Sequence, residues 1–305
     1  MTRALRLVGF ACVLALAPAA HAYVATRTDA GMAIHWPMRC IVISPDARGD
    51  QSADEIDTEA IYSTLSRAIS NWNSRIKTCS YLALGVVRPT RALEAVSDGR
   101  PAVVFRSDVW GRGDRTYDPS AIGVTTVWFA NRPDDPADGQ ITDADIELNA
   151  VDYSFTNTPV TATPRQGTRV ADLENTLTHE LGHVLGLAHT CWDHKTDTAP
   201  PDETGAPSPD CSAPDLPMKV TSATMFPYAE ERATNMRVVA DDDKNGVCQT
   251  YPIDDTPSAC YGFIEGAGCA VPSVIEGPRP AALLALGLLL CGSLALRSRQ
   301  RRGRI

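Results

Sequence analysis

Apolar residues recur every three or four positions between residues 54 and 77, where they form one stripe along a helix. The stripe consists of Ile61, Leu65, Ile69, Trp72 and Ile76. Acidic residues crowd the start of this segment, where they favour the positive end of a helix dipole. The pattern predicts a long amphipathic helix that serves as core scaffold.

Strands are predicted where short runs of β-branched and aromatic residues lie between turn residues. These runs are residues 32–44, 81–87, 102–106, 123–130 and 141–149. Pro37 interrupts the first run, so that strand either lies at a sheet edge or begins after the proline. Residues 158–168, rich in Pro, Thr and Gly, predict a loop.

A second helix is predicted after Asp172, whose side chain suits the N-cap position. Its buried side would consist of Leu173, Leu177, Leu181 and Val184. The small residue Gly182 would allow this helix to pack closely against the sheet. Residues 242–247 predict the acidic start of a last helix.

The two ends of the chain carry export signals. Residues 1–22 resemble a signal peptide, with two arginines, an apolar run and an Ala-His-Ala cleavage site, which predicts a mature start at Tyr23. A transmembrane helix is the alternative, but the apolar run is short for one. Near the other end, residues 281–296 are apolar and residues 297–305 contain five arginines. Sixteen helical residues span about 24 Å, against about 30 Å for a bilayer core. We expect residues 281–296 to cross the membrane and residues 297–305 to stay cytoplasmic.

Gly268 and Cys269 lie in residues 263–280, a Pro-containing linker that precedes this apolar segment. Together with the arginines, this arrangement resembles the C-terminal sorting tails of myxobacterial surface proteins. The resemblance implies processing near Cys269 and retention at the cell surface.

Charge and cysteine content agree with export. Without the signal and everything from Cys269 on, 20 basic and 36 acidic residues remain, a net charge of −16 that excludes nucleic acid as a partner. Six cysteines remain between these segments, and an even number in an exported domain predicts disulfides. We expect sequential pairing, because each bond then closes a local loop: Cys40–Cys79, Cys191–Cys211 and Cys248–Cys260. A cysteine zinc cluster would need a closer spacing than any present.

The segment HELGHVLGLAH carries the chemistry of the chain. His179 and His183 lie four residues apart, so on a helix both reach one metal ion. Gly186 can turn the chain out of the helix and bring back His189 as a third ligand. Three protein ligands leave one zinc position for water, as in catalytic sites, and Glu180 lies beside them as a general base. The short HExxH pattern occurs by chance in many helices, whereas the extended pattern is specific.

With this motif the chain resembles the metzincin zinc metallopeptidases. Met225-Phe226-Pro227 downstream resembles the Met-turn of their matrixin branch, and the acidic last helix fits the same branch. The resemblance implies an α+β fold with a twisted, mixed five-stranded sheet, an active-site helix, a long backing helix and a small C-terminal subdomain with one helix. The catalytic domain would cover residues 23–262, with its N-terminal subdomain ending near residue 186.

The resemblance also implies a substrate cleft. In the family, an outer antiparallel strand pairs with the extended substrate, and by order we assign this role to residues 123–130, including Gly123, Val124, Thr125 and Thr126. Tyr228 would line the cleft wall or stabilise the oxyanion. The family often carries structural Ca²⁺, for which the acidic loop 131–145 is a candidate, although such loops are usually just solvated.

The chain departs from matrixins in one respect, because 35 residues separate His189 from Met225. We expect an insertion, closed by Cys191–Cys211, that forms one wall of the cleft. His194 lies in it and is an alternative third ligand, although only His189 fits the spacing.

We therefore expect a monomeric, secreted or surface-anchored zinc endopeptidase that acts on proteins or peptides. Zinc would activate a water whose proton Glu180 accepts and passes to the leaving amine. The alternatives are a non-catalytic adhesin or binding module on the same fold, and a metal-dependent hydrolase of esters or sugars.

Overall fold

The computed structural model describes residues 23–52, 56–255 and 257. The predicted signal peptide, the linker with Cys269, the membrane segment at 281–296 and the basic tail lie outside these residues. Among the described helices, none combines the length and the apolar character needed to cross a membrane.

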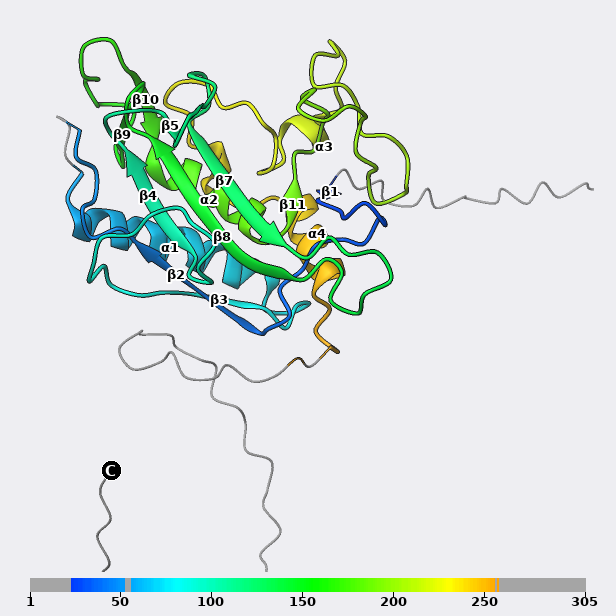
Figure 1. The fold of residues 1–305 in the computed structure, drawn as a ribbon. Coiled ribbons are helices and arrows are strands. Elements are labelled where there is room, and N and C mark those ends of the chain that lie inside the picture. The colour runs from blue at the N-terminus through cyan, green and yellow to red at the C-terminus, as the bar shows by residue number, and fades with distance from the viewer. Residues whose placement is uncertain (1–22, 53–55, 256, 258–305) are drawn as a thin grey trace, which may run out of the picture. The chain divides into compact units, whose positions relative to one another are not determined.

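The fold is α+β and is built on a mixed five-stranded sheet (Figure 1). Its strands are β2 (Cys40–Pro45), β3 (Ala83–Val86), β4 (Ala102–Arg106), β7 (Gly123–Phe129) and β8 (Ile141–Asn149), in the order β3-β2-β4-β8-β7. All neighbouring strands are parallel except β7, which is antiparallel to β8 and forms one edge. The first predicted strand begins only at Cys40, after Pro37, as the proline required.

Two helices pack on one another against one face of this sheet, α1 (Thr58–Ile76) and α2 (Leu173–Val184) (Figure 1). The predicted apolar stripe of α1 is buried, and the Trp72 indole donates a hydrogen bond of 2.9 Å to the Thr178 carbonyl of α2. Asp172 caps α2 by accepting from the Asn175 amide at 2.8 Å, which confirms the predicted N-cap. Helix α2 also packs against β7, which fixes the side chains of α2 relative to that edge strand.

Short elements complete the fold. They are β1 (Val24–Ala25), β5 (Gly111–Arg112), β6 (Arg115–Thr116), β9 (Tyr153–Thr156), β10 (Arg169–Asp172), β11 (Leu187–Ala188), α3 (Met218–Thr221), the 3-10 helix η1 (Asn235–Arg237) and α4 (Asp241–Thr250). Strand β1 pairs antiparallel with β11, and β9 pairs parallel with β10. The β9–β10 pair flanks the loop predicted at 158–168 and was not expected from the sequence.

The disulfide pattern corrects part of the sequential pairing. Cys191–Cys211 is confirmed. Cys79, however, bonds Cys248, so Cys40–Cys79 and Cys248–Cys260 are wrong. The reason is tertiary packing: the end of α1 lies beside α4, where the Ile253 amide also donates to the Cys79 carbonyl at 3.0 Å. Cys40 is disulfide-bonded as well, and Cys260 lies outside the described residues.

Candidate metal centre

Helix α2 and the turn after it bring three histidine side chains together. His179 and His183 lie one turn apart on α2, with ring centroids separated by 5.0 Å. The chain leaves the helix at Gly186, whose φ of +90° favours glycine. A Cβ there would also lie 2.8 Å from the Ile34 carbonyl oxygen. Strand β11 then returns His189 to within 4.8 Å ring centroid distance of His183.

Hydrogen bonds assign the protons of all three rings. His179 Nδ1 lies 2.6 Å from the Thr224 carbonyl oxygen, and His183 Nδ1 lies 2.8 Å from the Leu187 carbonyl oxygen. His189 Nδ1 lies 2.9 Å from Asp193 Oδ2. These oxygens can only accept hydrogen bonds, so each Nδ1 is a donor. In a neutral imidazole, Nε2 then keeps its lone pair. The histidines are therefore set up as three Nε2 ligands.

These lone pairs point into one small space. The Nε2 atoms of His183 and His189 lie 3.2 Å apart, which is repulsive unless a proton or a metal ion lies between them. Burial and the two neighbouring imidazoles lower the pKa of His183 well below its ordinary value, which disfavours the proton. A metal ion therefore fits this donor set. The three histidines form the only group of three or more His, Cys, Asp or Glu side chains, among the described residues, close enough to share one.

The carboxylate of Glu180 lies next to the histidines and contacts strand β7. Its Oε2 accepts a hydrogen bond of 2.6 Å from the Thr125 hydroxyl. Gly123 gives it room, because a Cβ at that position would lie 2.7 Å from Glu180 Oε1. Burial raises the pKa of Glu180, while His179 and the Thr125 hydrogen bond act in the opposite direction. The carboxylate of this helix residue is thus held against the edge strand β7.

Met225 packs beneath the helix that carries the histidines. It is buried, and a Cβ added at Gly182 would lie 2.2 Å from its sulfur. The buried Asp243 of α4 accepts hydrogen bonds from the Thr224 amide at 2.6 Å and the Met225 amide at 3.3 Å. Asp243 therefore ties the acidic helix to the segment that holds this methionine, and the same segment supplies the Thr224 carbonyl that orients His179.

Asp193 contacts the metal centre but was missed by sequence analysis. Its Oδ2 accepts from His189 Nδ1, and its Oδ1 accepts from the Lys195 amide at 3.2 Å. Burial acts to raise the pKa of Asp193, but the hydrogen bond from His189 and the charge of Lys195 outweigh it and hold that pKa well below its usual range. Asp193 follows no periodic element, and only its distance of four residues from His189 could have suggested it.

His194 is not part of this group. It lies in the insertion, where its Nε2 contacts Asp210 Oδ2 at 3.0 Å and its ring lies tilted against Trp192, with ring centroids 3.8 Å apart. About 53% of its side-chain surface is exposed. Of the two candidates for a third ligand, the structure places only His189 with His179 and His183.

The other predicted cleft residues lie around this centre at different depths. Residues of β7 alternate, so Thr125 contacts Glu180 whereas Thr126 accepts a hydrogen bond of 3.0 Å from Arg112. Val124 pairs with Glu147 of β8 and is half-buried. Tyr228 is 58% exposed and lies edge-on against Phe226 at 5.6 Å. This exposed position agrees with a wall residue better than with a group aimed at the histidines.

The acidic loop does not form a carboxylate cluster. Asp135 and Asp138 accept hydrogen bonds from amides of their own loop, and Asp138 also accepts from the Thr28 hydroxyl. Asp143 and Asp145 are buried in β8 and accept from amides of residues 98–102. The expectation of calcium therefore gains no support here.

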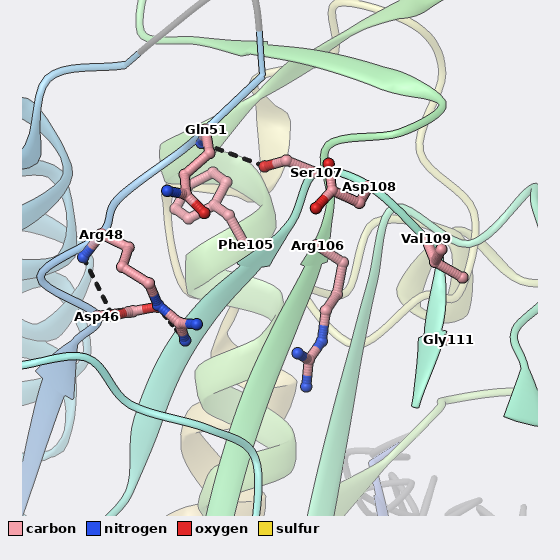
Figure 2. Close-up of a pocket in the computed structure, with 9 residues that line it drawn as sticks. All are labelled: Asp46, Arg48, Gln51, Phe105, Arg106, Ser107, Asp108, Val109 and Gly111. Atoms are coloured by element: carbon pink, nitrogen blue, oxygen red, sulfur yellow. Dashed lines mark hydrogen bonds and ion pairs between the residues drawn. The ribbon is translucent and has the colours of Figure 1, made fainter. Parts of the chain in front are cut away.

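A separate hollow lies between the ends of β2 and β4, and Figure 2 shows the residues around it. Its two arginines are both paired. Arg48 bonds Asp46 at 2.7 Å and Glu94 at 2.8 Å, and Arg106 bonds Glu147 at 2.6 Å and Glu94 at 3.0 Å. None of the three histidines lines it. Because its cations are neutralised within the protein, this hollow offers an anion little to bind.

Comparison with known proteins leaves the site to be judged on its own geometry. No protein-family model matches the chain, and no curated protein matches it either.

Proposed function

We propose that the protein is an exported zinc-dependent endopeptidase of the metzincin type, close to the matrixin branch. The observation that carries the proposal is the convergence of three Nε2 lone pairs beside a glutamate carboxylate. A purely structural metal site does not require such a carboxylate next to its ligands. Three histidines without a fourth protein ligand are typical of catalytic zinc, and imidazole nitrogen suits zinc among other transition metals.

The surrounding fold supports the same function. The site helix packs beside an edge strand, and the methionine and acidic helix that the family resemblance implies lie beneath the ligands. The outer side of β7 pairs with none of the described strands, so an extended peptide can add to it through backbone hydrogen bonds. Disulfides such as Cys79–Cys248 and Cys191–Cys211 are typical of an oxidising compartment and support export.

In this mechanism, His179, His183 and His189 would hold the zinc ion. Bound zinc supplies Lewis-acid chemistry, which polarises the scissile carbonyl and lowers the pKa of water. Glu180 takes a proton from water at its carboxylate and delivers it to the leaving amine. Thr125 holds Oε2 of that carboxylate, and the exposed edge of β7 aligns the peptide.

The proposal is tested with the recombinant domain and casein or gelatin as substrate, with and without a chelator. We expect near-stoichiometric zinc, chelator-sensitive cleavage that zinc restores, and loss of cleavage in Glu180→Gln with zinc retained. His189→Ala should lose zinc, whereas His194→Ala, on the neighbouring loop, should retain both zinc and activity. Full cleavage by Glu180→Gln would refute the assigned base. A domain that binds zinc but cleaves no protein would indicate a binding module instead.

A further inference from the structure

The three candidate ligands differ in what orients them. His179 and His183 donate from Nδ1 to backbone carbonyls, of Thr224 and Leu187, which are neutral and fixed by the main chain. His189 donates instead to a side-chain carboxylate, Asp193 Oδ2, at 2.9 Å. The third ligand alone of the three therefore has an anionic partner.

Asp193 is held firmly enough to serve as such a partner. Only 14% of its side-chain surface is exposed. The Lys195 amide donates to Oδ1 at 3.2 Å, and the Lys195 ammonium lies 3.3 Å from Oδ2. The carboxylate thus accepts from His189 with one oxygen, while Lys195 contacts both oxygens.

The insertion is built so that Asp193 cannot drift far from the histidines. Immediately before it, the Trp192 amide donates to the Pro209 carbonyl at 2.8 Å, and the Cys211 amide donates to the Trp192 carbonyl at 3.0 Å. The Cys191–Cys211 disulfide closes the same pair of segments. Two main-chain hydrogen bonds and one covalent bond therefore fix the backbone next to Asp193.

A carboxylate at this position has two physical effects on a ligand. It fixes the tautomer and ring orientation, and its negative charge makes Nε2 a stronger donor. The charge also offsets part of the charge of a divalent ion held by three neutral rings. Backbone carbonyls also fix the tautomer and ring orientation, but they do not carry the full negative charge of a carboxylate.

We infer that Asp193 is a positioning residue of the metal centre, which makes the disulfide-closed insertion a part of that centre. The inference rests on the metal site of the proposed function but does not require proteolysis. It assigns to the insertion a role in metal retention, in addition to the cleft wall expected from its place in the chain.

The test measures zinc affinity by competition with a chromophoric chelator in the wild-type domain and in Asp193→Asn and Asp193→Ala. Asparagine can still accept from Nδ1 through its amide oxygen but lacks the charge, whereas alanine lacks both. Loss of such a partner typically weakens metal binding about 10- to 100-fold, so we expect that range for alanine and a smaller loss for asparagine. The absorption spectrum of the Co²⁺-substituted protein should change in the alanine variant, because the His189 ring is no longer held.

Asp210→Asn is the matched control. It removes the carboxylate charge from the other Asp–His pair of the same insertion, formed with His194, without contact to a ligand, so its zinc affinity should stay within about twofold of wild type. The melting temperatures of the zinc-free variants check that they fold. If Asp193→Ala does not fold, the isosteric Asp193→Asn is used for the comparison of zinc affinity. Equal zinc affinity in wild type and the Asp193 variants would overturn the inference, and so would equal losses in Asp193→Asn and Asp210→Asn. A wild-type domain that binds no zinc would instead refute the metal centre itself.

Discussion

The contact between Gly182 and Met225 predicts a strong energetic coupling between the helix that carries the histidines and the methionine below it. A Cβ at Gly182 would lie 2.2 Å from the Met225 sulfur, 3.2 Å from its methyl carbon and 3.3 Å from a ring carbon of Trp72. All three neighbours are buried, so none can move into solvent. Gly182→Ala must therefore displace the methionine or the helix.

The expected magnitude follows from two opposing effects. Overpacking a buried contact costs about 1–3 kcal/mol. Replacing glycine by alanine within a helix gains about 1 kcal/mol. We therefore expect Gly182→Ala to lower the free energy of unfolding by up to about 2 kcal/mol, with a central value of about 1 kcal/mol. When Met225 is first changed to alanine, the clash disappears and the same substitution should raise the free energy of unfolding by about 0.5–1 kcal/mol.

A double-mutant cycle in urea tests this coupling. The wild type, the two single variants and the double variant are unfolded in the zinc-free form, followed by tryptophan fluorescence. Met225→Ala alone should cost about 2–5 kcal/mol, because it leaves a cavity under the helix. The interaction energy should be about 2 kcal/mol. If Gly182→Ala has the same effect with and without Met225, the steric reasoning is refuted.

Three further predictions concern the site and the sheet beside it. Thr125→Val removes the hydroxyl that holds Glu180 Oε2 at 2.6 Å and should lower kcat/KM roughly tenfold, whereas Thr125→Ser should stay near wild type. Replacing Cys191 and Cys211 with serine should weaken zinc binding and should add little to Asp193→Ala, because both changes release the same carboxylate. Burial and the neighbouring charge of Asp143 raise the pKa of Asp145 from 3.8 to about 7. A carboxyl group whose pKa is higher in the folded than in the unfolded state contributes its full stability below the unfolded-state pKa and loses it as the pH rises to the folded-state pKa. For Asp145 the free energy of unfolding should therefore fall by about 4 kcal/mol between pH 4 and 7. Asp145→Asn should remove that slope from the pH dependence of unfolding.

Each of these has an outcome that contradicts it. Equal loss of kcat/KM in the serine and valine variants of Thr125 would assign the effect to packing rather than to the hydroxyl. If the losses of zinc affinity from the serine replacements and from Asp193→Ala add, the disulfide and Asp193 act on zinc binding independently. An unchanged pH slope in Asp145→Asn would show that the pKa of this carboxyl is not raised in the folded state.

The residues of α2 were predictable because helix periodicity alone sets their geometry. A spacing of four residues places His179 and His183 on one face whatever surrounds the helix, and the glycine three residues later allows only a few paths to His189. The strand segments were predictable for a similar reason, since a run of β-branched residues indicates a buried strand from the local sequence alone. Even the start of β2 after Pro37 follows from local backbone chemistry.

Features that depend on tertiary packing were beyond such local reasoning. The pairing of Cys79 with Cys248 requires that α1 ends beside α4, and the preference for short loops led to the wrong partners. Asp193 belongs to an irregular loop, where no periodicity marks which side chain turns toward the histidines. In both cases the missing information was the position of one chain segment relative to another, which the spacing of residues within either segment does not encode.

The Cys79–Cys248 bond determines how the protein responds to cleavage of its backbone. It joins positions 169 residues apart, so α2, β7, the insertion and the Met225 segment all lie within one covalent ring. A single backbone cut anywhere in this ring opens the chain without releasing a fragment, and a cut between Cys191 and Cys211 remains bridged a second time. Nicked molecules should therefore migrate as one species without reductant and separate into two after reduction.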